Sequence, residues 1–364
     1  MRGRTLGLTA LFVLSLVVTG CSGTSADIKK VGFVTDVGTL EDKSFNEAGW
    51  IGAQAGAKAL GGTATNIVTK KASDYAANIK TFVDQGYGII VTSGFALGDA
   101  TTIAAKQYPN VKFVGTDQGV CVDETGKPDP TFACKGIAKT LLPNFQGLVY
   151  KEEQVGYLAG VLAASVSKTG VIGTVGGINT IPPVVKYING YRNGAASVNP
   201  DIDVKVAYVS TDINKAFSDP GTGKSIANQM IGQKADAIFQ VAGLSGQGAI
   251  EAACAAPDVI GIGVDVDQSK SLPGDVSCVL TSAEKKLVDA VTAAIGKIGD
   301  KTDVGGTTVW DASTTPVGVG LSPFQGKYVD LVTPEVQAKI DAALAGMKDG
   351  SIDPCKPTAC DKKD

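Results

Sequence analysis

Short apolar runs alternate with helix-forming stretches along almost the whole chain, and this alternation constrains the fold most. A buried strand of a parallel sheet reads as a short run of β-branched and apolar residues, and Val31–Thr35 is such a run. Further strands are predicted near residues 66–69, 88–92, 111–115, 171–175, 204–209, 237–242, 259–264, 276–280 and 317–321. Helices are predicted at residues 44–60, 73–85, up to 108, 152–165, 184–198, 224–234, 247–255, 283–298 and 335–348.

This alternation predicts an α/β fold made of mostly parallel sheets with helices on both faces. Two consecutive units follow the same plan, which indicates two lobes. One helix start is especially well marked, because Ser44-Phe-Asn-Glu47 matches the capping box. In that motif the Ser44 hydroxyl and the Glu47 carboxylate each accept a hydrogen bond from a backbone N–H at the helix start. Asp42 is interpreted as a capping or turn residue.

Polar residues and glycines gather where the predicted strands end. They occur at Thr35-Asp36, Ser93-Gly94, Thr116-Asp117, Gly176-Gly177, Ala242-Gly243 and Val264-Asp265. In open α/β sheets, ligands bind beyond the carboxyl ends of the strands. If the two lobes face each other, these strand ends line one cleft, so the sequence predicts a ligand site there.

The N-terminus has the pattern of an export signal. Two arginines, Arg2 and Arg4, precede an apolar run over residues 6–18, which is too short to span a bilayer comfortably. The run leads into Val18-Thr19-Gly20-Cys21, which resembles a bacterial lipobox. In such signals cleavage precedes the cysteine, whose sulfur then carries a diacylglycerol. A plain secretory signal beside an unrelated cysteine is the alternative.

These features predict a signal peptide at residues 1–20 and a lipidated tether at residues 21–30, with Cys21 as the lipidation site. The protein is then expected on a bacterial cell membrane, facing the periplasm or the cell exterior. The lipid is its only expected contact with the membrane.

The number of cysteines also agrees with an exported protein. Besides Cys21, the six cysteines are expected to form disulfides, and six allow 15 pairings. Pairing between sequence neighbours is the simplest set, in which Cys121 joins Cys134, Cys254 joins Cys278 and Cys355 joins Cys360. A structural zinc site is disfavoured, because the chain has no C-x-x-C motif and no histidine.

Composition and missing motifs argue against an enzyme. Without histidine there is no Ser-His-Asp or Cys-His catalysis, and a net charge of −3 gives no reason to expect nucleic-acid binding. Ser282-Ala-Glu-Lys285 matches S-x-x-K, but Lys168-Thr-Gly170 precedes it, which reverses the order found in penicillin-binding enzymes. No dinucleotide-binding G-x-G-x-x-G follows a strand and no P-loop occurs. No catalytic residue, cofactor or metal is therefore predicted.

Several motifs, in order along the chain, resemble the basic membrane protein (Bmp) family. The opening segment Asp36-Val-Gly-Thr-Leu-Glu-Asp-Lys-Ser-Phe45-Asn46 is similar to that family's signature. Similar segments follow at residues 154–160, 241–248, 261–268 and 280–285, so the resemblance covers nearly all of the mature chain. The resemblance implies a two-lobed type I periplasmic-binding-protein fold with three crossovers.

The best-understood members of that family are purine-nucleoside receptors of ABC importers, and the resemblance assigns roles to single residues. Phe45 and Phe217 would be aromatic walls that stack on the two faces of a purine, with Tyr208 as the alternative to Phe217 because the spacer after Tyr208 is long. Asn46 and Asp117 would contact the base edge. The ribose hydroxyls would be held by Asp36, Gly243, Asp265 and Lys285.

The resemblance also implies partners and domain limits. The expected partners are a purine nucleoside of the inosine, guanosine and adenosine class, a permease, and an ATPase on a separate chain; the receptor itself is expected to be a monomer. A receptor of the same fold for a sugar or a signalling molecule, or a surface sensor, is the alternative. Lobe 1 is expected at 31–145 plus 282–317, lobe 2 at 146–281 plus 318–350, and a tail with two cysteines at 351–364.

Overall fold

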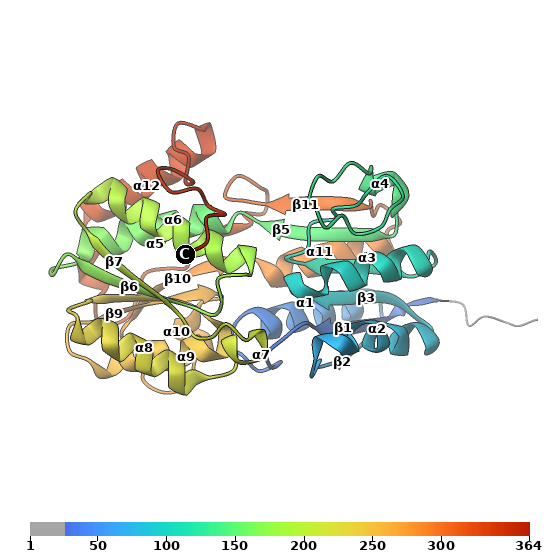
Figure 1. Ribbon diagram of the computed structural model, residues 1–364, viewed down its shortest axis with the longest axis horizontal. Coiled ribbons are helices and arrows are strands. Elements are labelled where there is room, and N and C mark those ends of the chain that lie inside the picture. The colour runs from blue at the N-terminus through green and yellow to red at the C-terminus, as the bar shows by residue number, and fades with distance from the viewer. Residues whose placement is uncertain (1–25) are drawn as a thin grey trace, which may run out of the picture.

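The computed structural model describes residues 26–364; the expected signal peptide and Cys21 lie outside this range. Two six-stranded sheets each form the centre of a lobe, and the lobes lie side by side along the long axis (Figure 1). Lobe 1 has the strand order β11-β5-β4-β3-β1-β2, and lobe 2 has the order β12-β10-β9-β8-β6-β7. The fold is therefore the expected two-lobed α/β architecture.

All strand pairs are parallel except β10 with β12. The strands of lobe 1 are β1 (Asp27–Thr35), β2 (Thr63–Ile67), β3 (Tyr87–Ser93), β4 (Lys112–Thr116), β5 (Phe145–Tyr150) and β11 (Gly306–Trp310). Those of lobe 2 are β6 (Val171–Gly176), β7 (Asp203–Tyr208), β8 (Ala237–Val241), β9 (Ile260–Asp265), β10 (Val279–Lys285) and β12 (Val319–Leu321). Central strands are buried on both faces, which explains their continuous apolar sequences.

Helices cover both faces of each sheet. The longer ones are α1 (Phe45–Ala59), α2 (Tyr75–Asp84), α3 (Gly98–Gln107), α5 (Glu152–Val166), α6 (Pro182–Val198), α8 (Pro220–Gly232), α9 (Gly243–Ala255), α11 (Leu287–Gly299) and α12 (Pro334–Asp349). Short ones are η1 (Ala72–Asp74), η2 (Phe95–Leu97), α4 (Ala138–Leu141), α7 (Ile213–Ala216), α10 (Gln268–Ser271) and η3 (Val329–Leu331). In lobe 1, α1 and α11 share one core and α2 and α3 another; in lobe 2, α5, α6 and α12 lie opposite α8 and α9.

Helices α5 and α6 pack with their backbones almost in contact. A Cβ atom added at Gly156 or Gly160 of α5 would lie 2.3 or 2.0 Å from a backbone oxygen of α6. The same holds in reverse for Gly190 and Gly194, where the distances to backbone oxygens of α5 are 2.3 and 2.0 Å. Only glycine permits this approach, so these four residues fix how closely α6 lies against the rest of lobe 2.

The chain passes between the lobes three times, after Tyr150, after Lys285 and after Trp310. Strand β5 belongs to lobe 1 and ends at Tyr150, so the first segment of lobe 1 extends beyond residue 145, the limit expected from the sequence. The helix expected at 283–298 begins at Leu287, because residues 283–285 continue β10. Strands β5 and β11 were not predicted from the sequence; they are the strands that bring the chain to and from the crossovers.

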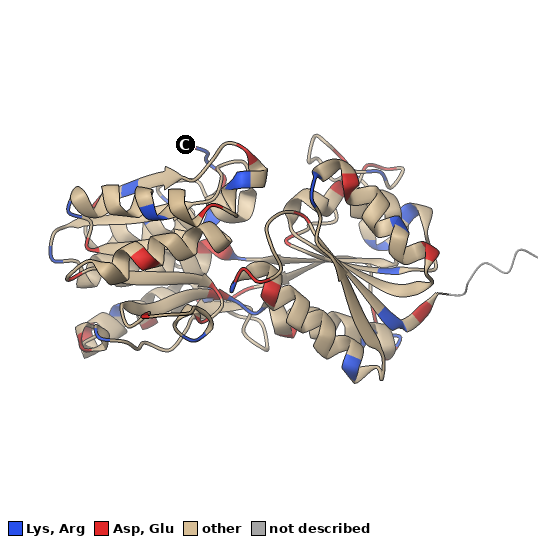
Figure 2. Cartoon of the chain, turned by 90° about the horizontal axis from the view of Figure 1, so that it is seen from below, with Lys and Arg blue, Asp and Glu red and all other residues tan. Residues whose placement is uncertain are grey.

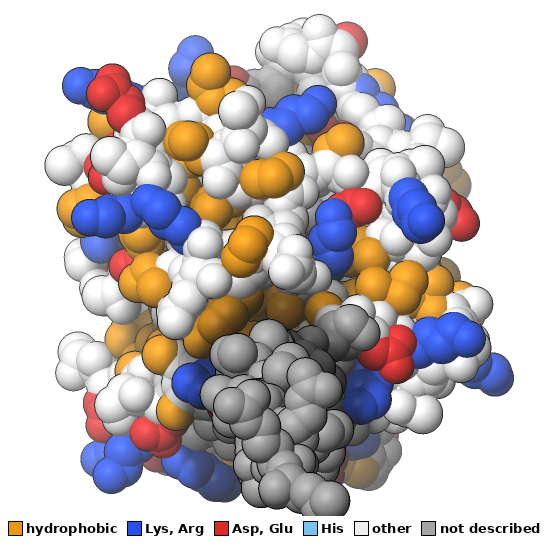
Figure 3. Space-filling model, turned by 90° about the vertical axis from the view of Figure 1, so that its right-hand side faces the viewer, with side chains coloured by type: hydrophobic (Ala, Val, Ile, Leu, Met, Phe, Trp, Pro, Cys, Tyr) orange, Lys and Arg blue, Asp and Glu red, His pale blue; other side chains and the backbone are white. Residues whose placement is uncertain are grey.

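Three disulfides join sequence neighbours: Cys121 with Cys134, Cys254 with Cys278 and Cys355 with Cys360. The simplest of the possible pairings is thus the one present. Within residues 26–364, no helix is long and apolar enough to cross a membrane. Charged residues of both signs are spread over both lobes (Figure 2), and at the outer end of lobe 1 lysines lie among scattered hydrophobic side chains (Figure 3).

Candidate ligand-binding site

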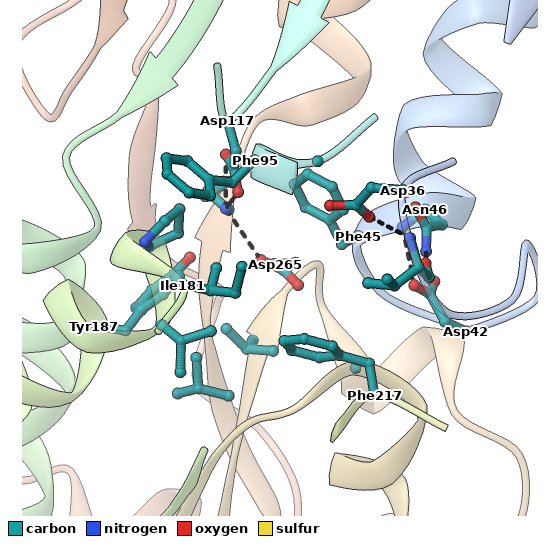
Figure 4. A pocket seen from close by; sticks show the side chains of 18 residues that line it. Asp36, Asp42, Phe45, Asn46, Phe95, Asp117, Ile181, Tyr187, Phe217 and Asp265 are labelled. Carbon is teal, nitrogen blue, oxygen red and sulfur yellow. Dashed lines mark hydrogen bonds and ion pairs between the residues drawn. The ribbon is translucent and has the colours of Figure 1, made fainter. Parts of the chain in front are cut away.

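A cavity lies between the two lobes; together with the open space at its mouth it measures about 630 Å³. All eight residues predicted from the sequence line it: Asp36, Phe45, Asn46, Asp117, Phe217, Gly243, Asp265 and Lys285. Gly94 and Val264, which belong to strand ends expected at the cleft, also line it, whereas sequence reasoning missed the remaining lining residues: Val37, Asp42, Phe95, Ile181, Pro183, Val184, Tyr187 and Val241. Figure 4 shows polar and aromatic side chains from both lobes meeting in this space.

The backbone at the strand ends is held in an uncommon conformation. Asp117 follows β4 with φ 58°, Asp265 ends β9 with φ 64°, and Gly243 follows β8 with φ 52°. A left-handed backbone conformation at a non-glycine residue costs about 1–3 kcal/mol, and residues in this conformation are found most often at functional sites. At Gly94, where φ is 110°, an added Cβ would lie 2.0 Å from Asp36 Oδ2. The Asp36 carboxylate can therefore occupy its place only because residue 94 is glycine.

Two phenylalanines reach the cavity from opposite lobes. Phe45 is the first residue of α1 in lobe 1, and Phe217 directly follows α7 in lobe 2. The Phe217 ring lies against the backbone of the β6–α6 loop, since a Cβ on Gly177 would be 2.3 Å from Phe217 Cε1. Tyr208 does not line this cavity; its hydroxyl donates to Asp364 Oδ2 at 2.9 Å. Geometry therefore favours Phe217 over Tyr208 as the second aromatic wall.

Lys285 lies at the centre of a buried group of opposite charges. Its Nζ is 2.7 Å from Asp117 Oδ2, 3.5 Å from Glu152 Oε1 and 3.8 Å from Asp265 Oδ1, and its side chain is 2% exposed. Burial alone would lower the pKa of Lys285, but the carboxylates of Asp117, Glu152 and Asp265 outweigh it and raise the pKa above its usual value. Lys285 therefore stays charged and joins Asp117 of lobe 1 to lobe 2.

The Lys285 ammonium also faces aromatic rings. It lies 4.7 Å from the ring centroid of Phe45, 5.4 Å from that of Tyr150 and 5.7 Å from that of Tyr187. A cation over an aromatic face is attracted by the ring quadrupole. Phe45 is therefore held in place from the polar side of the cavity. The Tyr187 hydroxyl, in turn, donates to the backbone oxygen of Ala283 at 3.1 Å.

Burial weakens the acidity of three carboxyl groups in and beside the cavity. Burial raises the pKa of Asp36 to about 7, although its oxygens accept from the backbone N–H groups of Val37 and Ala96. Burial likewise raises the pKa of Asp42 to about 7 and that of Glu152 to about 8. Two of these carboxyl groups, those of Asp36 and Asp42, line the cavity.

The start of α1 differs from the predicted capping box. Ser44 does not cap the helix; its Oγ donates to Asp265 Oδ2 in lobe 2 at 2.6 Å. Asp42 takes over the capping role, accepting from the backbone N–H groups of Ser44, Asn46 and Glu47 at 2.9–3.1 Å. Glu47 accepts from the N–H of Lys43 instead of that of Ser44. The interpretation of Asp42 as a capping residue is confirmed, and that of Ser44 was wrong.

The Asn46 side chain already forms hydrogen bonds within lobe 1. Its Nδ2 donates to the backbone oxygen of Val37 at 3.0 Å, and its Oδ1 accepts from Ser93 Oγ at 3.3 Å. These bonds fix the amide orientation beside the cavity. No group of three or more potential metal ligands occurs among residues 26–364.

A two-lobed α/β chain with a cavity at the facing strand ends has the fold of the solute-binding proteins of the periplasmic type. Residues 29–344 match the family model described as "ABC transporter substrate-binding protein PnrA-like", named Bmp. The chain therefore belongs to this ABC transporter substrate-binding family, and the resemblance found in its motifs is confirmed.

Related proteins and solved structures support this family assignment. The chain is 33% identical over 97% of its length to the "ABC transporter nucleoside-binding protein BmpA" of Lactococcus lactis, of which it covers 99%. It is 32% identical to "Basic membrane protein A" of Borreliella burgdorferi, over 76% of this chain and 75% of that one. A solute-binding protein of an ABC transporter system from Aeropyrum pernix has the same fold, with a TM-score of 0.74, 22% identity, and coverage of 89% and 92%. These relatives are binding proteins rather than enzymes.

Proposed function

We propose that this protein is a lipid-anchored receptor that captures a purine nucleoside between its lobes and delivers it to an ABC permease. The observation that carries the proposal is the placement of one phenylalanine from each lobe, Phe45 and Phe217, on a cavity that also presents carboxyl, amide and ammonium groups among its apolar side chains. A relative of equal length carries the name of a nucleoside-binding protein, which supports the same ligand class.

The two rings explain how a base would be held. A purine offers two π-faces, and stacking of a base on an aromatic ring contributes about 1–3 kcal/mol. Because Phe45 belongs to lobe 1 and Phe217 to lobe 2, both stacking contacts form only when the lobes are closed. The ligand thus binds the closed form better than the open form, which is the condition for a ligand to drive closure.

The polar groups would recognise the rest of the nucleoside. Asn46 and Asp117 contact the base edge in this proposal, since an amide both donates and accepts and a carboxylate accepts N–H bonds. Asp36, Asp265, Lys285 and the Gly243 backbone hold the ribose hydroxyls. A site built to bond a hydroxyl discriminates strongly against an analogue that lacks it, because its buried partners are left unpaired.

Calorimetric titration of the mature chain tests the proposal. The protein is first unfolded and refolded to release any ligand it carries, and then titrated with inosine, guanosine, adenosine, cytidine and 2′-deoxyinosine. We expect purine nucleosides to bind, 2′-deoxyinosine to bind more weakly, and Phe45→Ala to lose at least about tenfold in affinity. Absence of binding to every nucleoside, with binding to a sugar instead, would overturn the nucleoside assignment.

A separate measurement tests the anchor. If Cys21 carries a lipid, the full chain expressed in a bacterium should label with radioactive palmitate, and Cys21→Ala should remove the label. An unlabelled wild-type chain would contradict the lipid anchor while leaving the ligand proposal untouched.

A further inference from the structure

The segment that follows α12 folds back across α6. The match to the family model ends at residue 344, so residues 351–364 lie beyond the segment that the model matches. The disulfide between Cys355 and Cys360 closes a small loop in this segment, and Cys360 is buried. Figure 1 shows the end of the chain beside α6 in lobe 2. We refer to residues 351–364 as the strap.

Two buried asparagines of α6 are bonded to the strap. Asn189 is 1% exposed, and its Nδ2 donates to the backbone oxygens of Ala359, Cys360 and Lys362 at 2.8–3.2 Å. Asn193 is 2% exposed, and its Nδ2 donates to the oxygens of Pro354 and Thr358 at 2.8 and 2.7 Å. Its Oδ1 accepts from the Thr358 N–H at 3.0 Å. Buried amides need such partners, and here the strap supplies them.

Asp364 connects three elements near the cavity. Its Oδ1 lies 2.6 Å from Arg192 Nη1 of α6, and its Oδ2 accepts from the hydroxyl of Tyr208 in β7 at 2.9 Å. Its backbone oxygen accepts from Asn179 Nδ2 at 3.1 Å. Asn179 lies in the β6–α6 loop, so one residue of the strap holds that loop, the helix that follows it and the edge strand β7.

The elements held by the strap form one wall of the cavity. Residues three and four apart share a side of a helix, and Pro183, Val184 and Tyr187 present one side of α6 to the cavity. Asn189, Arg192 and Asn193 lie on another side of the same helix, against the strap. The loop before α6 also supports Phe217, because the ring of Phe217 rests on the backbone of Gly177.

We propose that the strap positions the β6–α6 loop and the first turns of α6 for ligand binding, with Asp364 as its principal positioning residue. Asp364 does not line the cavity; its side chain acts through Arg192 on α6 and through Tyr208, whose ring lies against Gly176, on the neighbouring Gly177 and so on Phe217. The use of inosine as the test ligand rests on the proposed function. Without the strap, the loop behind Phe217 relaxes and the aromatic wall is no longer held in place, so the affinity falls.

The test compares Asp364→Ala with Asp361→Ala in the purified protein. Asp361 is an exposed strap residue that makes none of these contacts, and its replacement changes the charge equally. We expect Asp364→Ala to raise the Kd for inosine by about tenfold, which corresponds to about 1.4 kcal/mol, and Asp361→Ala to leave it unchanged.

A double-mutant cycle separates positioning from general stabilisation. If Asp364 acts through Phe217, then Asp364→Ala has no further effect on the affinity of the Phe217→Ala protein, because the ring that it positions is gone. A residue that affects binding independently of Phe217 would raise the Kd of the Phe217→Ala protein by the same factor as that of the wild type. That additive result would overturn the proposal.

Hydrogen exchange provides a readout that needs no ligand. In the Asp364→Ala protein we expect faster exchange at residues 177–191 and unchanged exchange in α9, which the strap does not contact. If wild-type protein binds no nucleoside but this local change occurs, the proposed function fails while the strap's control of the loop stands. Unchanged exchange at residues 177–191 overturns the inference whatever the ligand.

Discussion

Ser44 Oγ donates to Asp265 Oδ2 at 2.6 Å, and this bond joins the first turn of α1 in lobe 1 to the end of β9 in lobe 2. The neighbouring residues of lobe 1 are also held by lobe 2. Gln247 Nε2 of α9 donates to the backbone oxygen of Asp42 at 2.8 Å, and Ser271 Oγ of α10 donates to that of Lys43 at 3.0 Å. The structure is therefore closed, and residues 42–44 form one contact between the lobes beside the pair of Lys285 with Asp117.

Removing these contacts should shift the protein toward its open form. In the Gln247→Ala/Ser271→Ala double variant, the closed state loses two hydrogen bonds of about 1 kcal/mol each. We expect the Kd of the ligand to rise by about tenfold, mainly through faster dissociation. Small-angle scattering should show a larger radius of gyration without ligand. Gln229→Ala, on the exposed side of α8, is the matched control; equal affinities of the double variant and this control would contradict the role of the contacts.

Lys285 should be essential for stability as well as for binding. Lys285→Met leaves the buried carboxyl groups of Asp117, Glu152 and Asp265 without their counter-charge. Breaking a buried pair by removing one partner costs about 3–5 kcal/mol. The free energy of unfolding, measured with urea, should fall by that amount. The neighbouring Lys286, which pairs with Glu284 nearer the surface, gives the control.

The control follows from solvent screening. Lys286→Met should change the free energy of unfolding by less than about 1 kcal/mol, because partly exposed pairs contribute little. If the free energy of unfolding falls by similar amounts in Lys285→Met and Lys286→Met, the buried charge group is no more important for stability than a surface pair. The Lys285→Met/Asp117→Asn double variant should recover part of the loss, since it removes one of the uncompensated charges.

The raised pKa values predict an unusual dependence of stability on pH. The pKa values of Asp36 and Asp42 are about 7 and that of Glu152 is about 8 in the folded protein, well above their values of 3.8, 3.8 and 4.5 in a free chain. The folded state therefore holds more protons than the unfolded state between these values. Its extra stability is fully present below the free-chain pKa and is lost as the pH rises through 7 and 8.

Urea unfolding between pH 5 and pH 8 measures this effect. Each such group contributes a slope of up to about 1.4 kcal/mol per pH unit, so the free energy of unfolding should fall as the pH rises. The chain has no histidine, so no imidazole titrates in this window. Asp42→Asn should flatten the slope, whereas Asp27→Asn at an exposed position should not. Stability that rises from pH 5 to pH 8 would rule out these protonated carboxyls.

The fold and much of the site could be predicted because they depend on local patterns. Apolar runs mark the buried strands, and parallel strands bring their polar ends to one place, so Asp36, Asp117 and Asp265 could be assigned to one cleft. Strands β5 and β11 escaped prediction. Gly306–Trp310 contains too few apolar residues to read as a buried strand, which suits its place at the edge of a sheet.

The remaining site residues depend on contacts that no local pattern contains. Glu152 lies in the first turn of α5, where an acid is expected simply to favour the helix dipole, yet it faces Lys285. Ser44 has the sequence context of a cap, and its partner Asp265 is 221 residues away. Tyr187 lies within the helix predicted at 184–198 and Ile181 lies just before it, and no local sequence pattern marks either as a cavity residue. Only the packing of the two lobes shows that they face the cavity.

Gly177 offers the last test, because it determines how close Phe217 can come to the β6–α6 loop. In Gly177→Ala, the new Cβ would lie 2.3 Å from Phe217 Cε1, so the ring must move. We expect the Kd for the ligand to rise by about tenfold, with part of the loss appearing as faster dissociation. Calorimetry and a stopped-flow measurement of dissociation would show both.

The matched substitutions are Gly232→Ala and Gly296→Ala, in helices α8 and α11, where an added Cβ meets nothing within 4 Å. They should leave the Kd unchanged and stabilise the protein by about 0.4–1 kcal/mol, since alanine restricts the unfolded chain. An unchanged Kd in Gly177→Ala would mean that the ligand does not depend on the position of Phe217. Tyr208 would not replace it, because its hydroxyl is bonded to Asp364, and the ligand would then be held chiefly by Phe45 and the polar groups of lobe 1.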